Sequence, residues 1–118
     1  MGRANRRTEG DPQYPLEDVI RLASVKQIDF TRKALDLEAP RIMPDVLNRR
    51  EAIRRIVIGL KRQDWEFAEE KKGGFVDVYK VRYGAEDIWL KFKLEPQGPV
   101  KKIVLVISFH EWDYTRPI

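Results

Sequence analysis

The sequence predicts an α+β fold in which N-terminal helices pack on a C-terminal three-stranded antiparallel sheet. Apolar residues recur at helical spacing up to about residue 70, whereas β-branched and aromatic residues dominate from residue 75 onwards. Helices gathered before a run of hairpin-connected strands are typical of α+β proteins. The length of 118 residues indicates one domain, which we place at residues 14–111, between a flexible N-terminal tail (1–13) and a C-terminal extension (112–118).

Helices are expected in the first half of the chain. The first begins at Pro15 and ends near Lys26, because Leu16, Val19, Ile20 and Ala23 repeat at i, i+3, i+4 and i+7. Residues 28–30 are expected to be an extended link. A short helix follows over residues 32–38 and ends before Pro40. A longer helix is expected after Pro44, and a fourth, over residues 62–70, ends at the Lys-Lys-Gly-Gly run of 71–74.

Three strands are expected in the second half, over residues 75–83, 87–94 and 101–109. A tight turn at 84–86 joins the first two as a hairpin. The second strand alternates, so that Asp87, Trp89, Lys91 and Lys93 lie on the face opposite its apolar residues. The third strand is apolar on both faces, which predicts a central strand covered on both sides.

The composition excludes several kinds of site. The chain has no cysteine and a single histidine, His110, so thiol nucleophiles, thiolate zinc sites and multi-histidine metal sites are excluded. We expect no metal and no other cofactor. No apolar run approaches the roughly 20 residues of a membrane span, and no secretory signal is recognisable. We therefore expect a cytoplasmic protein without a membrane partner, and the net charge of +4 favours a polyanionic partner.

The face formed by Trp89, Lys91 and Lys93 is the most informative feature. Proteins that bind single-stranded RNA hold phosphates with cations and stack bases on aromatic rings. The alternative is an ordinary solvated face whose lysines prevent edge pairing. His110 is the one side chain with an unperturbed pKa near neutrality, so it is either a proton-transfer group, with Glu111 as its neighbour, or a structural residue.

A second basic surface is possible on the third expected helix. Its cations are Arg49, Arg50, Arg54, Arg55, Lys61 and Arg62. They form either a patch that guides RNA or docks an acidic partner, or a solvated helix face with pairs such as Glu51–Arg55.

Several short segments, in order and with similar spacing over residues 15–111, resemble the motility quorum-sensing regulator (MqsR) toxins. These are Ile-Val-Ile-Gly-Leu at 56–60, Asp-Trp at 64–65, Asp-Val-Tyr at 77–79, Trp-Leu-Lys at 89–91 and Val-Leu-Val-Ile-Ser-Phe at 104–109. The resemblance implies a RelE-like fold and a messenger-RNA interferase of a type II toxin–antitoxin system. It also implies metal-independent cleavage of single-stranded mRNA, growth arrest and neutralisation by a cognate antitoxin, with the ribosome as a further possible partner.

The functional positions of that family transfer only in part. Four family positions, held there by lysine, glutamine, tyrosine and lysine, carry Phe67, Val76, Trp89 and His110 in this chain. Lys91 matches, and Lys71 and Lys72 lie close to the first position. Either the chain is an inactive relative, or its site is rewired with His110 as the proton-transfer group. We favour rewiring, because a proton-transfer group stands at a position where the family needs one.

In the rewired site, Lys91 and Arg82 clamp the scissile phosphate with help from Lys93, Lys71 or Lys72. His110 supplies general acid or base catalysis, and Trp89, together with Tyr79, stacks a flanking base. The alternatives are a non-catalytic basic module that binds RNA or regulates, and a protein-binding scaffold.

Overall fold

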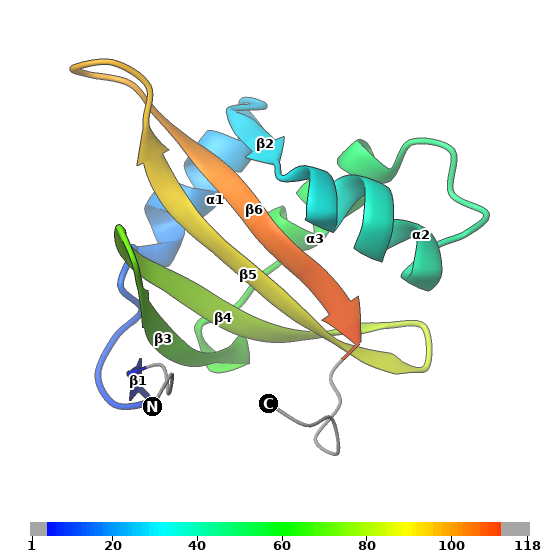
Figure 1. The fold of residues 1–118 in the computed structure, drawn as a ribbon, viewed down its shortest axis with the longest axis horizontal. Helices are drawn as coiled ribbons and strands as arrows, with labels where there is room; N and C mark the ends of the chain where they lie inside the picture. The colour runs from blue at the N-terminus through cyan, green and yellow to red at the C-terminus, as the bar shows by residue number, and fades with distance from the viewer. Residues whose placement is uncertain (1–4, 112–118) are drawn as a thin grey trace.

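The computed structural model describes residues 5–111, which form a six-stranded mixed sheet with helices on one face (Figure 1). The strand order across the sheet is β1-β3-β4-β5-β6-β2. Strand β2 runs parallel to β6, and the other neighbours are antiparallel. The strands are β1 (Arg6–Arg7), β2 (Ile28–Phe30), β3 (Trp65–Lys71), β4 (Gly74–Tyr83), β5 (Glu86–Pro96) and β6 (Lys102–Glu111).

The prediction of a three-stranded antiparallel sheet is therefore wrong, although the broad α+β class holds. Strands β4, β5 and β6 lie where they were expected. The additional strands are β1, within the expected tail; β2, at the expected link; and β3, at the expected fourth helix. Strand β3 contains three glutamates and an alanine, residues that favour helices. A bulge between Trp65 and Phe67 also interrupts its alternation, so the pairing with β4 overrides a local helical signal.

The helical segments are α1 (Leu16–Ser24), a π-helix η1 (Lys33–Glu38) continued by α2 (Ala39–Ile42), α3 (Arg49–Ile58) and a 3₁₀ turn η2 (Arg62–Asp64). Pro40 does not end the second helix as predicted. It lies at the start of α2, a position whose backbone angles suit proline. Helix α3 begins later than expected, because the Asn48 side chain accepts a hydrogen bond from the Glu51 N–H and caps it there.

The two faces of the sheet differ in burial. Ile88, Leu90 and Phe92 of β5 are fully buried against the helices, as their alternation predicts. On β6 the core-facing residues are also buried, but Ile103, Leu105 and Ile107 remain half-exposed. Strand β6 is central but not covered on both sides, which corrects that prediction. We call the uncovered side the open face, and it holds the candidate site.

Within the part of the chain that the structure describes, no helix is long and apolar enough to cross a membrane. Residues 112–118, the expected extension, lie outside the described residues.

Candidate nucleic-acid interface

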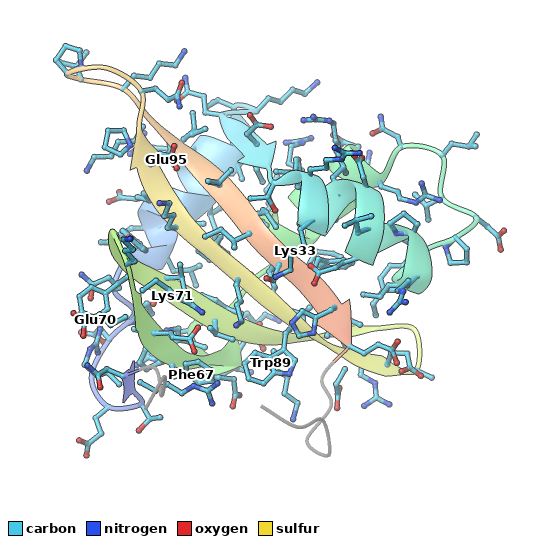
Figure 2. All side chains as sticks on the ribbon, viewed as in Figure 1. Lys33, Phe67, Glu70, Lys71, Trp89 and Glu95 are labelled. Atoms are coloured by element: carbon cyan, nitrogen blue, oxygen red, sulfur yellow. The ribbon has the colours of Figure 1, made fainter. Side chains whose placement is uncertain are left out.

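The open face contains a pocket of about 330 Å³ that five lysines line. Lys91 and Lys93 project from β5, Lys71 from the end of β3, Lys72 from the turn that follows it, and Lys33 from η1. Figure 2 shows Lys33 and Lys71 on the face of the sheet that is turned away from the helices. The remaining lining residues are Gly73, Gly74, Phe75, Val76, Ile107 and Ser108. No carboxylate is among the lining residues described, so this lysine pocket suits a polyanion.

A buried carboxylate lies beside the lysine pocket. Glu69 of β3 is 2% exposed and contacts Lys71 Nζ at 3.2 Å, Arg6 Nε at 3.3 Å and Lys91 Nζ at 3.4 Å. Burial acts to raise the pKa of Glu69, but Lys91, Lys71 and Arg6 outweigh it and hold that pKa below its ordinary value. Glu69 therefore stays ionised and fixes the position of two pocket lysines.

Four of the pocket lysines form ion pairs. Among these four, Lys91 has the most buried side chain, which is 16% exposed. Burial lowers the pKa of Lys91, and the carboxylate of Glu69 offsets this only in part. A lysine whose ammonium is poorly hydrated interacts strongly with an anionic ligand and gives up its proton more readily than a surface lysine does.

An aromatic group borders the lysine pocket on the open face. The rings of Trp89 and His110 stack with centroids 6.1 Å apart, and Phe67 packs its ring edge-on to Trp89 at 5.5 Å. The Arg6 guanidinium covers Phe67 at 4.4 Å from the ring centroid. Figure 2 places Phe67 and Trp89 side by side below Lys71. Lysine ammonium groups and aromatic rings thus adjoin on one surface.

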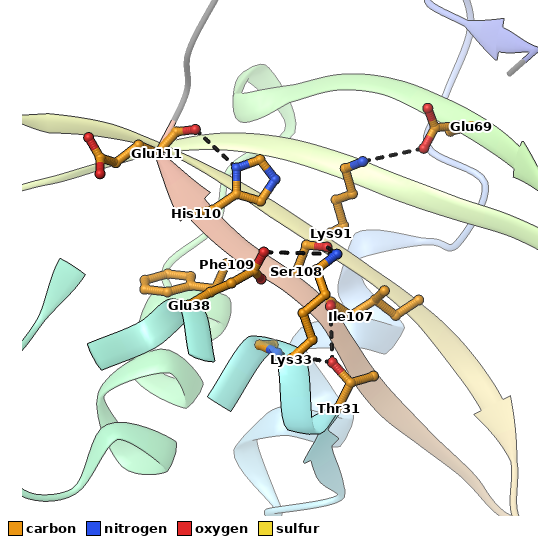
Figure 3. Close-up of polar contacts among 11 residues, drawn as sticks. Thr31, Lys33, Glu38, Glu69, Lys91, Ile107, Ser108, Phe109, His110 and Glu111 are labelled. Atoms are coloured by element: carbon orange, nitrogen blue, oxygen red, sulfur yellow. Dashed lines mark hydrogen bonds and ion pairs between the residues drawn. The ribbon is translucent and has the colours of Figure 1, made fainter. Parts of the chain in front are cut away.

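His110 lies two residues along β6 from Ser108, which lines the lysine pocket. It pairs with Trp89 across the strands, while Ser108 pairs with Lys91. Lys91 and His110 are diagonal neighbours, which typically lie about 7–8 Å apart. The Nδ1 atom of His110 lies 3.0 Å from the carbonyl oxygen of Glu111 (Figure 3). Glu111 thus contacts the ring through its backbone rather than through its carboxylate.

Two predicted site residues do not join this group. Tyr79 is fully buried on the helix-covered face, where its ring stacks on Phe92 at 5.2 Å. It has no surface to offer a base, so its predicted stacking role is wrong. Arg82 lies on the open face but bonds Asp87 at 3.3 Å. Asp87 is four residues from Lys91, about 13 Å along a strand, so Arg82 does not join Lys91 in a phosphate clamp.

The second basic surface is largely satisfied within the molecule. Glu51 holds Arg54 at 2.8 Å and Arg55 at 3.1 Å, and these hydrogen bonds lower the pKa of Glu51 to about 2. Arg49 donates to the carbonyl oxygens of Met43 and Pro44. These arginines brace the helices, which favours the structural interpretation of α3.

The N-terminal segment covers the edge of the sheet. Strand β1 pairs with β3 through Arg6 and Arg7, within the stretch expected to be a flexible tail. Further on, the backbone N–H groups of Gln13 and Tyr14 donate to the buried carboxylate of Asp77 at 2.9 Å. These bonds fix residues 5–14 and bring Arg6 over the open face.

Sequence reasoning finds Lys71, Lys72, Lys91 and Lys93 but misses Lys33, Ser108, Glu69 and Arg6. Lys33, Glu69 and Arg6 come from elements that the pattern does not place, and Ser108 faces the pocket because of a bulge in β6. The Thr-Arg-Lys run at 31–33, directly after an apolar strand-like triplet, is a signal that could have found Lys33.

Among residues 5–111, no three histidine or carboxylate side chains are close enough together to hold a metal ion. No known protein family matches the chain, and no curated protein is significantly similar to it.

Proposed function

We propose that this protein is an endoribonuclease that cleaves single-stranded mRNA without a metal ion, and that it acts as the toxin of a toxin–antitoxin pair. One observation carries the proposal: a pocket of five lysines adjoins the Trp89–His110 stack on an open sheet face. The resemblance of residues 15–111 to the motility quorum-sensing regulator toxins supports the same activity. It also suggests a cognate antitoxin as the protein partner.

The reaction needs three groups besides the RNA. The 2′-hydroxyl attacks the neighbouring phosphorus and loses its proton, while the departing 5′-oxygen must gain one. In our proposal His110 transfers one of these protons and solvent water exchanges the other; general acid or base catalysis by a side chain is typically worth 10²–10⁴-fold in rate. Lys91, with Lys93, Lys71 and Lys72, stabilises the charge that grows on the phosphoryl oxygens.

Substrate binding follows from the same layout. Trp89 presents a half-exposed ring beside the pocket, and base stacking on such a ring contributes about 1–3 kcal/mol. Single-stranded RNA exposes both its bases and its phosphates to such a surface, whereas a duplex hides its bases.

The decisive experiment is cleavage of a defined single-stranded RNA in EDTA by the purified wild type and by His110→Ala. We expect the variant to be at least about 100-fold slower. Arg21→Ala, at an exposed position on α1 away from the open face, is the control and should cleave like the wild type. The 5′ fragments should end in 2′,3′-cyclic phosphates.

Two results would contradict this role. A folded His110→Ala protein with near wild-type turnover would remove His110 from the mechanism. Products with 5′-phosphates would indicate a different chemistry. RNA that is bound in a salt-dependent manner but stays intact, even with translating ribosomes present, would favour the non-catalytic RNA-binding module instead.

A further inference from the structure

A serine lies between two of the lysines in the pocket. Ser108 Oγ accepts a hydrogen bond from Lys33 Nζ at 3.1 Å, and Ser108 pairs across the strands with Lys91. Figure 3 shows the Lys33 ammonium beside Ser108, while the Lys91 side chain starts next to Ser108 and extends towards Glu69. Ser108 is 2% exposed, and it lines the lysine pocket. Three polar residues from η1, β5 and β6 therefore line the same pocket.

A β-bulge in β6 turns Ser108 towards this pocket. Lys91 pairs with Ser108 while the next residue, Phe92, pairs with Val106, so Ile107 is an extra residue in β6. As a result, Ile107 and Ser108 both line the pocket, although successive residues of a regular strand face opposite sides. Bulges of this kind redirect side chains and are common next to functional sites.

The helical segment η1 is fastened to this bulge at both of its ends. Thr31 donates its hydroxyl to the carbonyl oxygen of Ile107 at 3.0 Å, and Glu38 accepts from the Phe109 N–H at 2.9 Å. The π-helical turn between them places Lys33 over Ser108. These bonds hold Lys33 and Ser108 in register before any ligand arrives, which lowers the entropic cost of binding.

The charges around the subsite favour a dianion. Glu38 lies 3.8 Å from Lys33, and Glu69 lies 3.4 Å from Lys91, each outside the pocket lining. With Glu95 beside Lys93, three carboxylates stand against five lysines, which leaves two positive charges in excess (5 − 3). Ser108 accepts from Lys33, so its own hydroxyl hydrogen is able to donate to a ligand oxygen.

We propose that Lys33, Ser108 and Lys91 form a subsite for a phosphomonoester, in particular the 3′-phosphate of a nucleotide. The inference rests on the proposed function, because the subsite would hold a phosphate of the same RNA strand that His110 and Lys91 act upon. It adds a ligand and two residues, Lys33 and Ser108. The two ammonium groups donate charge-assisted hydrogen bonds, which are about twice as strong as neutral ones.

Calorimetric titration of the full chain tests the subsite with three probes: uridine 3′-monophosphate, inorganic phosphate and uridine. We expect the nucleotide to bind most tightly, inorganic phosphate to bind detectably, and uridine to bind at least about tenfold more weakly than the nucleotide. Two results would overturn the proposal. One is equal affinity for uridine and its 3′-monophosphate, even with detectable binding of inorganic phosphate. The other is no binding of either the nucleotide or inorganic phosphate.

The variants assign the binding to these residues. Lys33→Gln should weaken nucleotide binding at least about tenfold, and Ser108→Ala about threefold to tenfold. Lys33→Arg should stay within about threefold of the wild type, since it keeps the charge. Lys101→Gln, an exposed lysine in the turn before β6, is the matched control and should bind like the wild type.

Comparison with RNA cleavage separates the two proposals. Phosphate binding that depends on Lys33, together with intact RNA, would keep the subsite and reject the nuclease. Cleavage by the wild type with identical nucleotide binding by Lys33→Gln and Lys101→Gln would keep the nuclease and reject the subsite. If Ser108→Ala fails to fold, Lys33→Gln still decides, because the Lys33 side chain is 57% exposed and its loss opens no cavity.

Discussion

Two buried carboxylates on neighbouring strands lie on opposite faces of the sheet and differ in their partners and in their roles. Asp77 of β4 is fully buried on the helix-covered face, and Glu69 of β3 is 2% exposed on the open face. Asp77 pairs with Ala68, the residue next to Glu69, so the two carboxylates lie close in the ladder but on opposite sides of it. Their partners determine what each one does.

Asp77 is held by neutral donors. It accepts hydrogen bonds from the backbone of Gln13 and Tyr14 and from Trp65 Nε1 at 3.0 Å. Burial raises the pKa of Asp77 in spite of these three bonds. Such a group joins the N-terminal segment to the sheet, which is a structural task.

Glu69 is held by cations, and its pKa is lowered rather than raised. It orders Lys71 and Lys91 at the edge of the lysine pocket. The same chemical group therefore fixes chain segments on one face and arranges charge on the other. Burial alone therefore does not identify a functional carboxylate; the charge of its neighbours does.

Replacing Asp77 should have the largest effect on stability. In Asp77→Asn one oxygen becomes an amide donor that faces an N–H donor, so at least one buried bond is lost. We expect the free energy of unfolding to fall by about 2–4 kcal/mol, measured by urea denaturation. Asp87→Asn, a surface carboxylate paired with Arg82, is the control and should change it by under about 0.5 kcal/mol. A loss below about 1 kcal/mol would reject a structural role for Asp77.

Glu69→Gln should lower the free energy of unfolding by less, about 1–3 kcal/mol at neutral pH. The loss is smaller because Lys71, Lys91 and Arg6 keep partial access to water. Since the pKa of Glu69 is lowered on folding, its contribution is present above the unfolded value near 4.5 and is lost as the pH falls through the folded pKa. The stability difference between wild type and variant should therefore shrink in acid.

The raised pKa of Asp77 has the opposite effect on how stability depends on pH. Its titration removes stability as the pH rises through 3.8 towards the folded pKa. Unfolding curves from pH 3 to 7 for the wild type, Asp77→Asn and Glu69→Gln measure both trends. If the stability difference for Glu69→Gln stayed constant over that range, the contrast between the two carboxylates would be refuted.

The sequence predicts the regular parts of the fold and not the parts built from long-range pairing. The alternation of residues 87–94 and the turn at 84–86 are local signals, and both are confirmed. Strands β1 and β2 are two and three residues long, too short to carry a period. Their pairing is decided by the neighbouring strand, which no local pattern records.

The candidate site is predictable to a similar extent. Four of its lysines lie on one strand or in one turn, where alternation and the Gly-Gly signal place them. Lys33 and Ser108 meet across 75 residues of chain through a bulge at Ile107, so their contact depends on the parallel pairing of β2 with β6. The predicted stacking role of Tyr79 also fails, because the residue spacing in β4 does not show which face of that strand the helices cover.

Tyr79 gives the smallest expected effect and tests the assignment of the two faces. Its buried hydroxyl has no hydrogen-bond partner among the described residues, and burial raises the pKa of Tyr79. In Tyr79→Phe the ring still stacks on Phe92, while a desolvated hydroxyl is removed. We therefore expect the free energy of unfolding to stay constant or to rise by up to about 1 kcal/mol.

RNA cleavage by Tyr79→Phe should equal that of the wild type, since the residue lies on the same covered face as Asp77. Trp89→Ala supplies the contrast on the open face, where losing a stacking ring should weaken RNA binding by about 1–3 kcal/mol. Urea denaturation and RNA titration of both variants measure these effects. A Tyr79→Phe protein that lost RNA affinity while keeping its stability would show that the covered face also takes part in binding. That result would contradict the assignment of RNA binding to the open face alone.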